Sequence, residues 1–275
     1  MALLIRLKGN APRPDLPIVG VRGFPITDLV GLYCFDQNDT VGSIKNWAPG
    51  GAPTAAQTAG AAGDSAALMA NGGIRLQATA HVPGPTIDMT QPWSAFWHGR
   101  IESPLVPGGP SPWTSGFITT TVTTTRGIVV FQTVGSIYPD ASTLLAFAMR
   151  VSANGVQLPA VGTPGTAGLT YGAIGTLCLR FAPDSASTGT AEVLFVRGGA
   201  IVVRASAQVD IAAMTKDGAG NVVSTMKPVL GSQSPIYPRG SLAVETWGVY
   251  KRKLSDQGLA TVDAAGAVIR QARSR

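Results

Sequence analysis

The feature that most constrains this chain is a series of short strand-like segments with no long amphipathic helix between them. Each segment has four to ten residues, is rich in β-branched or aromatic side chains, and is bounded by Gly, Pro, Asn or Ser. In chain order they include LVGLYCFD, GIRLQATAHV, SAFWHGRI, GFITTTVTTT, GIVVFQTVG, TLLAFAMRVS, GVQLPAV, GTLCLRFAP, AEVLFVRGG and AIVVRASAQV. Strands that follow one another without helices form sandwiches or barrels, so we expect one all-β domain.

Two boundaries between these segments predict tight hairpins. Gly198-Gly199 lies between AEVLFVR and AIVVRAS, and Asn154-Gly155 lies between AMRVSA and VQLPAV. Both pairs suit the positive φ angles that two-residue hairpin turns require. We therefore expect each pair to join two antiparallel strands.

Two segments look different from the strands. Residues 1–27 contain four prolines, which prevent a helix and favour an extended arm, and ALLIRLKG at its start could pair as a strand with another chain. Residues 48–73 form an Ala/Gly-rich stretch of low complexity. This composition predicts a long surface loop, with a short helix near Ser65–Ala70.

The positive charge of the chain is concentrated at its two ends. Only 13% of residues are charged, about half the usual share. The net charge of +6 is the sum of +3 from residues 1–27, −1 from residues 28–238 and +4 from residues 239–275. Nucleic-acid binding calls for a charged folded face with interleaved aromatics, so we expect no nucleic acid and instead ends that anchor the chain to an acidic partner. The candidate anchors are Arg6, Lys8, Arg13, Arg22, Lys251, Arg252, Lys253 and Arg270.

A last strand and a closing helix are predicted near the C-terminus. The stretch LAVETWGVY, residues 242–250, alternates strictly, which predicts one strand with two distinct faces. Ser255 is a good helix N-cap, and Asp256 suits the positive start of a helix. Apolar residues then recur at helical spacing at Leu259, Val262, Ala265 or Gly266, and Ile269.

The cysteines and the N-terminal residues indicate in which cellular compartment the protein is made. Cys34 and Cys178 lie in apolar runs at a spacing that matches no metal or redox motif, so two reduced core thiols and one disulfide both remain open. MALLIRLKGN has too short an apolar stretch for a signal peptide, and no run approaches a membrane span. We expect a protein made in the cytoplasm that does not insert into a membrane.

The C-terminal stretch resembles the final strand of laminin-G-like, concanavalin A-like jelly-roll domains. In that family the strand typically reads Ile-Asp-Glu-Val-Arg-Ile-Tyr, followed by Asn-Arg-x-Leu-Ser-Asp and a short helix. Here residues 244–250 read VETWGVY and residues 251–256 read KRKLSD. Further segments are similar and fall in family order: LVGLYCFDQNDT, IKNWAPGG, TIDMTQPWSAFWHGRI, the hairpin around Gly198-Gly199, and KPVLGSQSPIYPRG.

This resemblance covers roughly residues 29–262 and implies a two-sheet antiparallel jelly-roll sandwich. The expected organisation is an extended basic arm at 1–27, the sandwich at 28–254, and a C-terminal helix and basic tail at 255–275. The chain departs from the family pattern in the last strand, where the acidic pair is reduced to Glu245 beside Thr246. A Gly also stands at 258, where the family has a capping Glu.

The residue types needed for catalysis are sparse. Glycosidases of this fold need two carboxylates that flank the scissile bond, but the three glutamates, Glu102, Glu192 and Glu245, are far apart and no strand carries two acids at alternate positions. No nucleophile elbow or P-loop occurs. His98 follows a tryptophan inside a strand, which is more typical of a structural residue than of a base. We expect no enzymatic activity.

Two kinds of ligand remain as hypotheses. Many members of the family bind calcium, and Asp36, Asn38 and Asp39 form an oxygen-rich cluster, although a turn stabilised by these side chains is the better explanation. Sugar binding needs aromatic platforms, and the candidates in Pro/Gly-rich loops are Trp93, Trp113, Tyr138 and Tyr237. Packing of these rings under long loops is the better explanation of them. Trp47 and Trp97 are better explained as core residues.

These observations favour two functions. The first is a structural and interaction protein of a virus particle, such as a bacteriophage tail, baseplate or capsid-decoration component, anchored through its termini to other virion proteins and forming a homo-oligomer. An arm that adds a strand to a neighbouring sheet would supply the affinity. The second is a carbohydrate-binding, lectin-like adhesion module for cell-surface glycans. No cofactor is expected apart from the calcium considered above.

Overall fold

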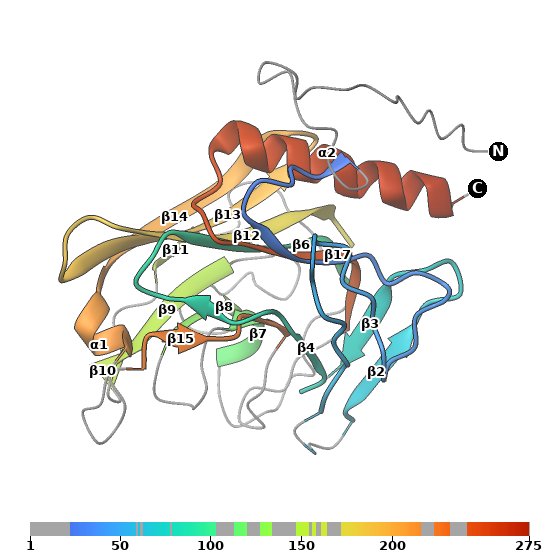
Figure 1. Ribbon diagram of the computed structural model, residues 1–275, viewed down its shortest axis with the longest axis horizontal. Coiled ribbons are helices and arrows are strands. Elements are labelled where there is room, and N and C mark those ends of the chain that lie inside the picture. Colours follow the sequence, from blue (N-terminus) through green and yellow to red (C-terminus); the bar gives the residue numbers. More distant parts are fainter. Residues whose placement is uncertain are drawn as a thin grey trace.

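Two antiparallel sheets stack face to face, and a C-terminal helix covers the outer face of the larger one (Figure 1). The expected all-β sandwich is therefore confirmed. The computed structural model describes residues 23–58, 60, 63–77, 79–102, 113–119, 127–133, 147–153, 156–157, 161–163, 172–215, 223–231 and 241–274. For the strands between 113 and 163 it describes the backbone.

The larger sheet has eight strands in the order β14-β13-β12-β6-β17-β3-β2, with β1 also paired to β17. Strand β17 is central: β6 pairs along one edge, and β3 and β1 share the other. The strands are β1 (Leu29–Tyr33), β2 (Ser65–Leu68), β3 (Ile74–Gln77), β6 (Trp93–Ile101), β12 (Ile174–Pro183), β13 (Thr188–Arg197), β14 (Ala200–Asp210) and β17 (Leu242–Tyr250).

The smaller sheet has seven strands in the order β10-β9-β8-β7-β16-β4, with β11 also paired to β9. A two-stranded ribbon joins β5 to β15, and the helices of the described part are short α1 and long α2. The elements are β4 (His81–Pro83), β5 (Ile87–Asp88), β7 (Trp113–Thr119), β8 (Gly127–Thr133), β9 (Phe147–Ala153), β10 (Val156–Gln157), β11 (Val161–Thr163), β15 (Thr225–Met226), β16 (Val229–Gly231), α1 (Ile211–Thr215) and α2 (Asp256–Arg273).

The segments predicted as strands all contain strands, but some of them were predicted too long. GIRLQATAHV forms two strands, β3 in the larger sheet and β4 in the smaller one. The carboxylate of Asp64 accepts hydrogen bonds of 2.6 Å from both the backbone N–H and the hydroxyl of Thr79, between the two strands. This polar anchor holds the chain at the point where it passes from one sheet to the other.

Both predicted hairpins are supported by strand pairing. Arg197 lies opposite Ala200 across Gly198 and Gly199, whose φ angles are 60° and 78°. Strands β9 and β10 pair on either side of residues 154–155.

The predicted helix near Ser65–Ala70 is wrong, because this segment is strand β2. It pairs with β3 from Ser65 opposite Gln77 to Leu68 opposite Ile74. Gly72 and Gly73, which follow β2, have φ angles of 83° and 89° and allow the chain to reverse. Pairing with β3 outweighs the helical preference of a short alanine-rich stretch.

The strict alternation predicted for the last strand is also wrong. Val244 lies opposite Gly99 and Thr246 lies opposite His98, so Glu245 is the extra residue of a β-bulge. The bulge shifts the side-chain alternation by one residue. Trp247 therefore joins Val244 in the core between the sheets.

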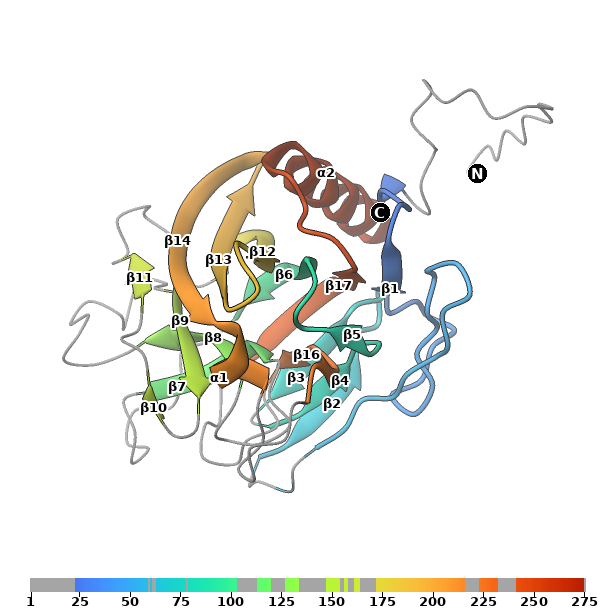
Figure 2. The same ribbon diagram turned by 60° about the vertical axis from the view of Figure 1, so that its left-hand side comes forward.

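The outer face of the larger sheet forms a second apolar core with α2. Helix residues at positions 259, 262, 265 and 269 pack on Phe96, Cys178 and Leu194 of the sheet, which confirms the predicted helical face. The hydroxyl of the N-cap Ser255 accepts a hydrogen bond of 3.0 Å from the backbone N–H of Gly258. Every residue of β17 is buried because the sheet is covered on both sides (Figure 2).

The described part of the predicted arm belongs to this second core. Phe24 is fully buried and stacks on Phe96 with ring centroids 5.8 Å apart. The Tyr250 hydroxyl donates a hydrogen bond of 2.9 Å to the carbonyl of Pro25. The prediction of an arm that extends to residue 27 is therefore wrong for residues 23–27, because an apolar ring here packs under α2.

Two glycines of α2 give a matched test of this packing. A Cβ at Gly266 would lie 2.4 Å from Cγ of His98, whereas a Cβ at Gly258 meets only side chains at 3.4 Å or more. We expect Gly266→Ala to lower the free energy of unfolding by about 1–3 kcal/mol through overpacking. Gly258→Ala should leave it unchanged or raise it by up to about 1 kcal/mol. Urea unfolding of the two variants checks this, and equal effects would contradict the described seating of α2.

Candidate functional site

The most concentrated group of charges in the described structure lies where α2 begins. Arg180 of β12 and Glu192 of β13 stand opposite each other on the outer face and are both buried. The guanidinium donates two hydrogen bonds to the carboxylate, at 2.9 Å and 3.2 Å. It also donates to the carbonyl of Leu254 at 2.7 Å and pairs with Asp256 at 2.9 Å. Arg180 thus joins the sheet to the start of the helix.

Two further cations complete this cluster at its solvent side. Lys253 lies 2.6 Å from the carboxylate of Glu192. Arg204 of β14 lies 2.5 Å from Asp256 and 3.4 Å from Glu192. The cluster therefore holds three cations and two anions, and all its charges are paired.

The two carboxylates of the cluster are held in the ionised form. A hydrogen bond from Arg204 and another from Arg180 lower the pKa of Asp256. Burial raises the pKa of Glu192, but hydrogen bonds from Arg180 and Lys253 outweigh this and leave it below the ordinary value. Neither group is suited to release or take up a proton near neutral pH.

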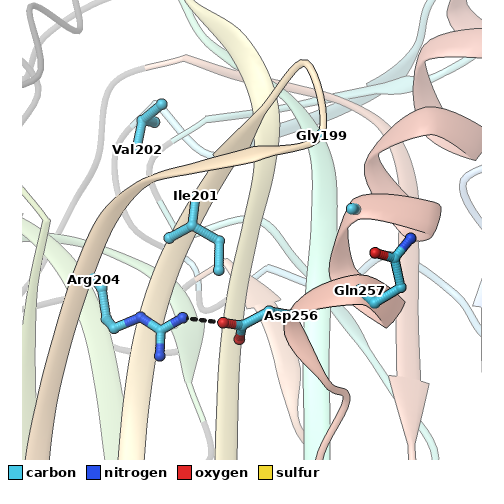
Figure 3. Close-up of a pocket in the computed structure, with 7 residues that line it drawn as sticks. Gly199, Ile201, Val202, Arg204, Asp256 and Gln257 are labelled. Carbon is cyan, nitrogen blue, oxygen red and sulfur yellow. Dashed lines mark hydrogen bonds and ion pairs between the residues drawn. The ribbon is translucent and has the colours of Figure 1, made fainter.

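A groove of about 610 Å³ lies beside this cluster, between β14 and the first turn of α2 (Figure 3). Arg204 and Asp256 point toward each other across it. Val202 is the extra residue of a bulge in β14, since Val196 pairs with Ile201 and Phe195 with Val203. The lining residues are Gly199, Ile201, Val202, Arg204, Asp256, Gln257 and Ala260. This groove is the candidate functional site.

The other two glutamates are also paired with arginines. Glu102 lies 2.7 Å from both Arg75 and Arg100, and the hydrogen bond from Arg75 is the main reason that its pKa is lowered to about 2. Glu245, the bulge residue of β17, lies 3.0 Å from Arg273 near the end of α2. Each glutamate therefore joins different elements of the fold.

His98 belongs to a buried polar group under α2, as its interpretation as a structural residue implied. Its Nδ1 lies 3.0 Å from the hydroxyl of Thr176, which donates to Asp263 at 2.8 Å. The second carboxylate oxygen of Asp263 accepts the backbone N–H of Gly199 at 3.0 Å. His98 is 2% exposed, so it is poorly placed to act on a substrate.

The predicted aromatic sugar platforms do not form a site in the described residues. Trp93 is wrong as an exposed platform, because it begins β6, is fully buried, and stacks on Phe181 with centroids 6.1 Å apart. Trp113 lies in β7, where only the backbone is described. Tyr138 and Tyr237 lie outside the described residues. Of the two tryptophans predicted as core, Trp97 is fully buried, whereas Trp47 is partly buried against the second core.

The predicted anchoring cations divide into three groups. Lys251 is exposed, and Arg252 lies over the ring of Tyr250 at 5.6 Å. Lys253 and Arg270 instead have carboxylate partners within the fold, Arg270 at 4.0 Å from Glu245. The remaining four lie outside the described residues, and they are Arg6, Lys8, Arg13 and Arg22.

The predicted calcium cluster forms a side-chain-stabilised turn. The carboxylate of Asp39 accepts backbone N–H groups of Asp36 at 2.8 Å and Lys45 at 3.0 Å. The carboxylate of Asp36 lies 3.4 Å from Arg273. Asn38 lies in the same turn. Calcium binding by these residues stays a prediction.

Cys34 and Cys178 are both buried as reduced thiols, as the reduced-thiol alternative predicted. Burial raises the pKa of the Cys178 thiol to about 12, so this thiol stays protonated and unreactive.

The cluster around Arg180 was missed at the level of sequence, although a signal for it exists. Arg180 and Glu192 each interrupt an otherwise apolar strand, in TLCLRFA and AEVLFV. A charge inside such a strand is expected to have a partner. The register of β12 against β13, which supplies the partner, becomes visible only in the structure.

Several solved structures are similar to this chain. No family model and no curated protein sequence matches the chain. A sialidase from Trypanosoma rangeli aligns with 88% of this chain at 12% identity and a TM-score of 0.53. The complex of that sialidase with sialic acid aligns at 11% identity and a TM-score of 0.50. A structure concerned with cell entry of botulinum neurotoxin type C aligns with 89% of this chain and 51% of its own, at 8% identity and a TM-score of 0.48.

The match to the sialidase covers only part of that protein. This chain spans 33% of the sialidase chain, so the likeness concerns one part of that protein. At such low identity it shows a shared β-sandwich fold, the fold that the resemblance implied. In the described part of the chain, neither helix has the length and apolar character needed to cross a membrane.

The buried pair gives a testable contrast between two arginines of one cluster. The side chain of Arg180 is 5% exposed and that of Arg204 is 44% exposed. We expect Arg180→Met to lower the free energy of unfolding by about 3–5 kcal/mol, because it leaves Glu192 as a buried anion that has lost its main partner. Arg204→Met should cost less than about 1 kcal/mol. Denaturant unfolding of both variants checks this, and a small effect at Arg180 would contradict its role in joining helix and sheet.

The same contacts predict loss of stability in acid. The pKa values of Glu192 and Asp263 are both lower in the folded state than their ordinary values. For Asp263, burial raises the pKa, but hydrogen bonds from His98, Gly199 and Thr176 lower it by more than burial raises it. The stabilisation is fully present above the ordinary pKa values of 4.5 and 3.8 and is lost as pH falls below them. We expect the urea midpoint to be constant from pH 7 to about 5 and to fall below about pH 4. A weaker acid dependence in Asp263→Asn would support the assignment, and an unchanged one would contradict it.

Proposed function

We propose that this protein is a non-catalytic structural and interaction component of a virus particle, of the bacteriophage tail, baseplate or decoration type. In this proposal the chain is anchored through its two basic ends and presents the sandwich. Other virion proteins and further copies of the chain are the partners. A sandwich whose net positive charge comes from its two ends suits such an assembly role.

The observation that carries the proposal is that both ends of the described chain lie on one side of the sandwich. Residues 23–25 pack beneath α2, and a Cβ at Gly23 would lie 3.5 Å from that of Ala265. The chain then finishes in α2 on the same outer face. The basic segments therefore join the body at a common side, while the smaller sheet faces the opposite side. One surface can hold both ends.

The state of the glutamates supports a non-catalytic role. A retaining or inverting glycosidase needs a carboxylic acid with a raised pKa beside a second carboxylate. Here the pKa values of Glu102 and Glu192 are lowered, and arginines from other elements hold all three glutamates in place. In the proposed function the three glutamates stabilise the fold by pairing with arginines of other elements, and they take no part in catalysis.

Particle purification tests the virion role. Particles from cells that encode this protein should contain it at a fixed copy number after density-gradient purification, detected by mass spectrometry. A variant with Ser at Arg6, Lys8, Arg13 and Arg22 should fail to join the particles. The control variant replaces Lys45 and Arg197, exposed cations of the sandwich body, and should be incorporated normally. Recovery of the native protein only in the particle-free fraction would refute this role.

The non-catalytic role has its own test. We expect no release of fluorophore from neutral glycosides or sialosides when these are incubated with the purified protein at pH 4 to 8. Turnover that disappears in Glu102→Gln, Glu192→Gln or Glu245→Gln would contradict the structural role of that glutamate.

The groove at β14 and α2 favours a second candidate function, binding of glycans by a lectin-like module. It combines apolar side chains with a guanidinium, a carboxylate and an amide, which is the usual composition of a small-ligand site. This function is compatible with the first, since a displayed sandwich can carry a ligand site.

A further inference from the structure

We propose that the groove between β14 and α2 binds an uncharged saccharide, with Arg204, Asp256 and Gln257 as the recognition residues. This proposal rests on the second candidate function and names its site and its ligand class. The site differs from the aromatic platforms that the sequence predicted. It uses planar polar side chains beside a small apolar surface.

The buried residues Arg180 and Glu192 hold the polar side chains of the groove in position. One oxygen of Asp256 pairs with Arg180 at 2.9 Å and the other with Arg204 at 2.5 Å. Arg204 also reaches Glu192 at 3.4 Å. The buried Arg180–Glu192 pair therefore orients both groove residues before any ligand arrives, which lowers the entropic cost of binding.

These groups retain capacity for a ligand. A guanidinium has five N–H donors and a carboxylate has about four acceptor positions, so the contacts above use only part of each. The side chains of Arg204 and Asp256 are 44% and 53% exposed. Neighbouring hydroxyl groups of a sugar both donate and accept, which matches a donor and an acceptor side by side. The amide of Gln257 offers one more of each.

The apolar part of the groove suits the C–H face of a sugar ring. Ile201 and Val202 of β14 and Ala260 of α2 contribute it, and Val202 is 37% exposed. The volume of about 610 Å³ lies within the usual range for small-molecule sites, about 300–1,000 Å³.

Charge selects against an ionic ligand. Arg204 and Asp256 are the charged residues that line the groove, and they pair with each other. The other cations of the cluster, Arg180 and Lys253, pair with Glu192 and do not line the groove. An anionic sugar would bring its carboxylate close to that of Asp256, and a cationic ligand would meet Arg204. A neutral saccharide avoids both repulsions.

The shape of the strand edge selects against a peptide strand. Strand β14 is at the edge of the larger sheet and could in principle accept another strand. The bulge at Val202 interrupts its regular spacing at the groove, and bulges protect edges from such pairing. A compact ligand fits the groove better than an extended backbone does.

Saturation-transfer NMR with the full-length protein tests the proposal. The probes are the neutral disaccharides maltose, cellobiose and lactose, with 3′-sialyllactose as the charged counterpart of lactose. We expect at least one neutral probe to bind. We also expect Arg204→Ala to weaken it about tenfold, as for loss of a hydrogen bond to a charged group, and Gln257→Ala to weaken it about threefold. Sialyllactose should bind more weakly than lactose.

The control is Gln271→Ala, an exposed residue in the last turns of α2, which should bind like the native protein. Unfolding curves for each variant separate loss of binding from loss of folding. Binding that is unchanged in both Arg204→Ala and Gln257→Ala overturns the groove as the site but leaves glycan binding in place. Absence of binding to all probes overturns this proposal and the second candidate function, and leaves the virion role untouched. Tighter binding of sialyllactose than of lactose overturns the choice of a neutral ligand.

Discussion

The docking of α2 on the outer face of the larger sheet is the constraint on which the rest of the structure depends. An antiparallel sheet can leave one face in water, but this one is apolar on both faces. Phe96, Cys178 and Leu194 would be exposed without the helix. The sheet also carries buried charges, and the helix start supplies partners for Arg180 through the carbonyl of Leu254 and the carboxylate of Asp256. Apolar contact holds the helix, and the polar contacts fix its position along the sheet.

Much of this arrangement follows from the sequence. Alternation and turn residues gave the strands, and the spacing of Leu259, Val262 and Ile269 gave the buried face of α2. The N-cap at Ser255 was visible as well. Local patterns are informative where one element decides the outcome by itself. Local patterns predict side-chain direction poorly where the pairing of two distant strands determines it. At Glu245, pairing with β6 creates the bulge, and the bulge sets the direction of every later side chain in β17.

The candidate site shows the same limit more strongly. Loop-like context suggested that Trp93 was exposed, although pairing of β6 with β12 and a neighbouring Phe181 bury it. The groove is formed by residues from β14 and α2, which are about 50 positions apart and have no shared motif. Arg204 and Asp256 look like ordinary surface charges in the sequence. Their common surroundings arise because the same helix that covers the apolar face also places its first turn beside the edge strand.

The contact between the end of α2 and the beginning of the sandwich has a consequence for synthesis of the chain. Arg273 donates to the carbonyl of Cys34 and to the carboxylate of Glu245, and β17 pairs with β1 over more than 200 positions of sequence. The central strand and its cover thus leave the ribosome after the strands that they contact. Until they do, β1, β3 and β6 each lack a neighbour, and the apolar outer face is open to solvent. The larger sheet is therefore completed only after β17 and α2 have been synthesised, and a chain that stops before β17 is prone to aggregate rather than to form a smaller sandwich.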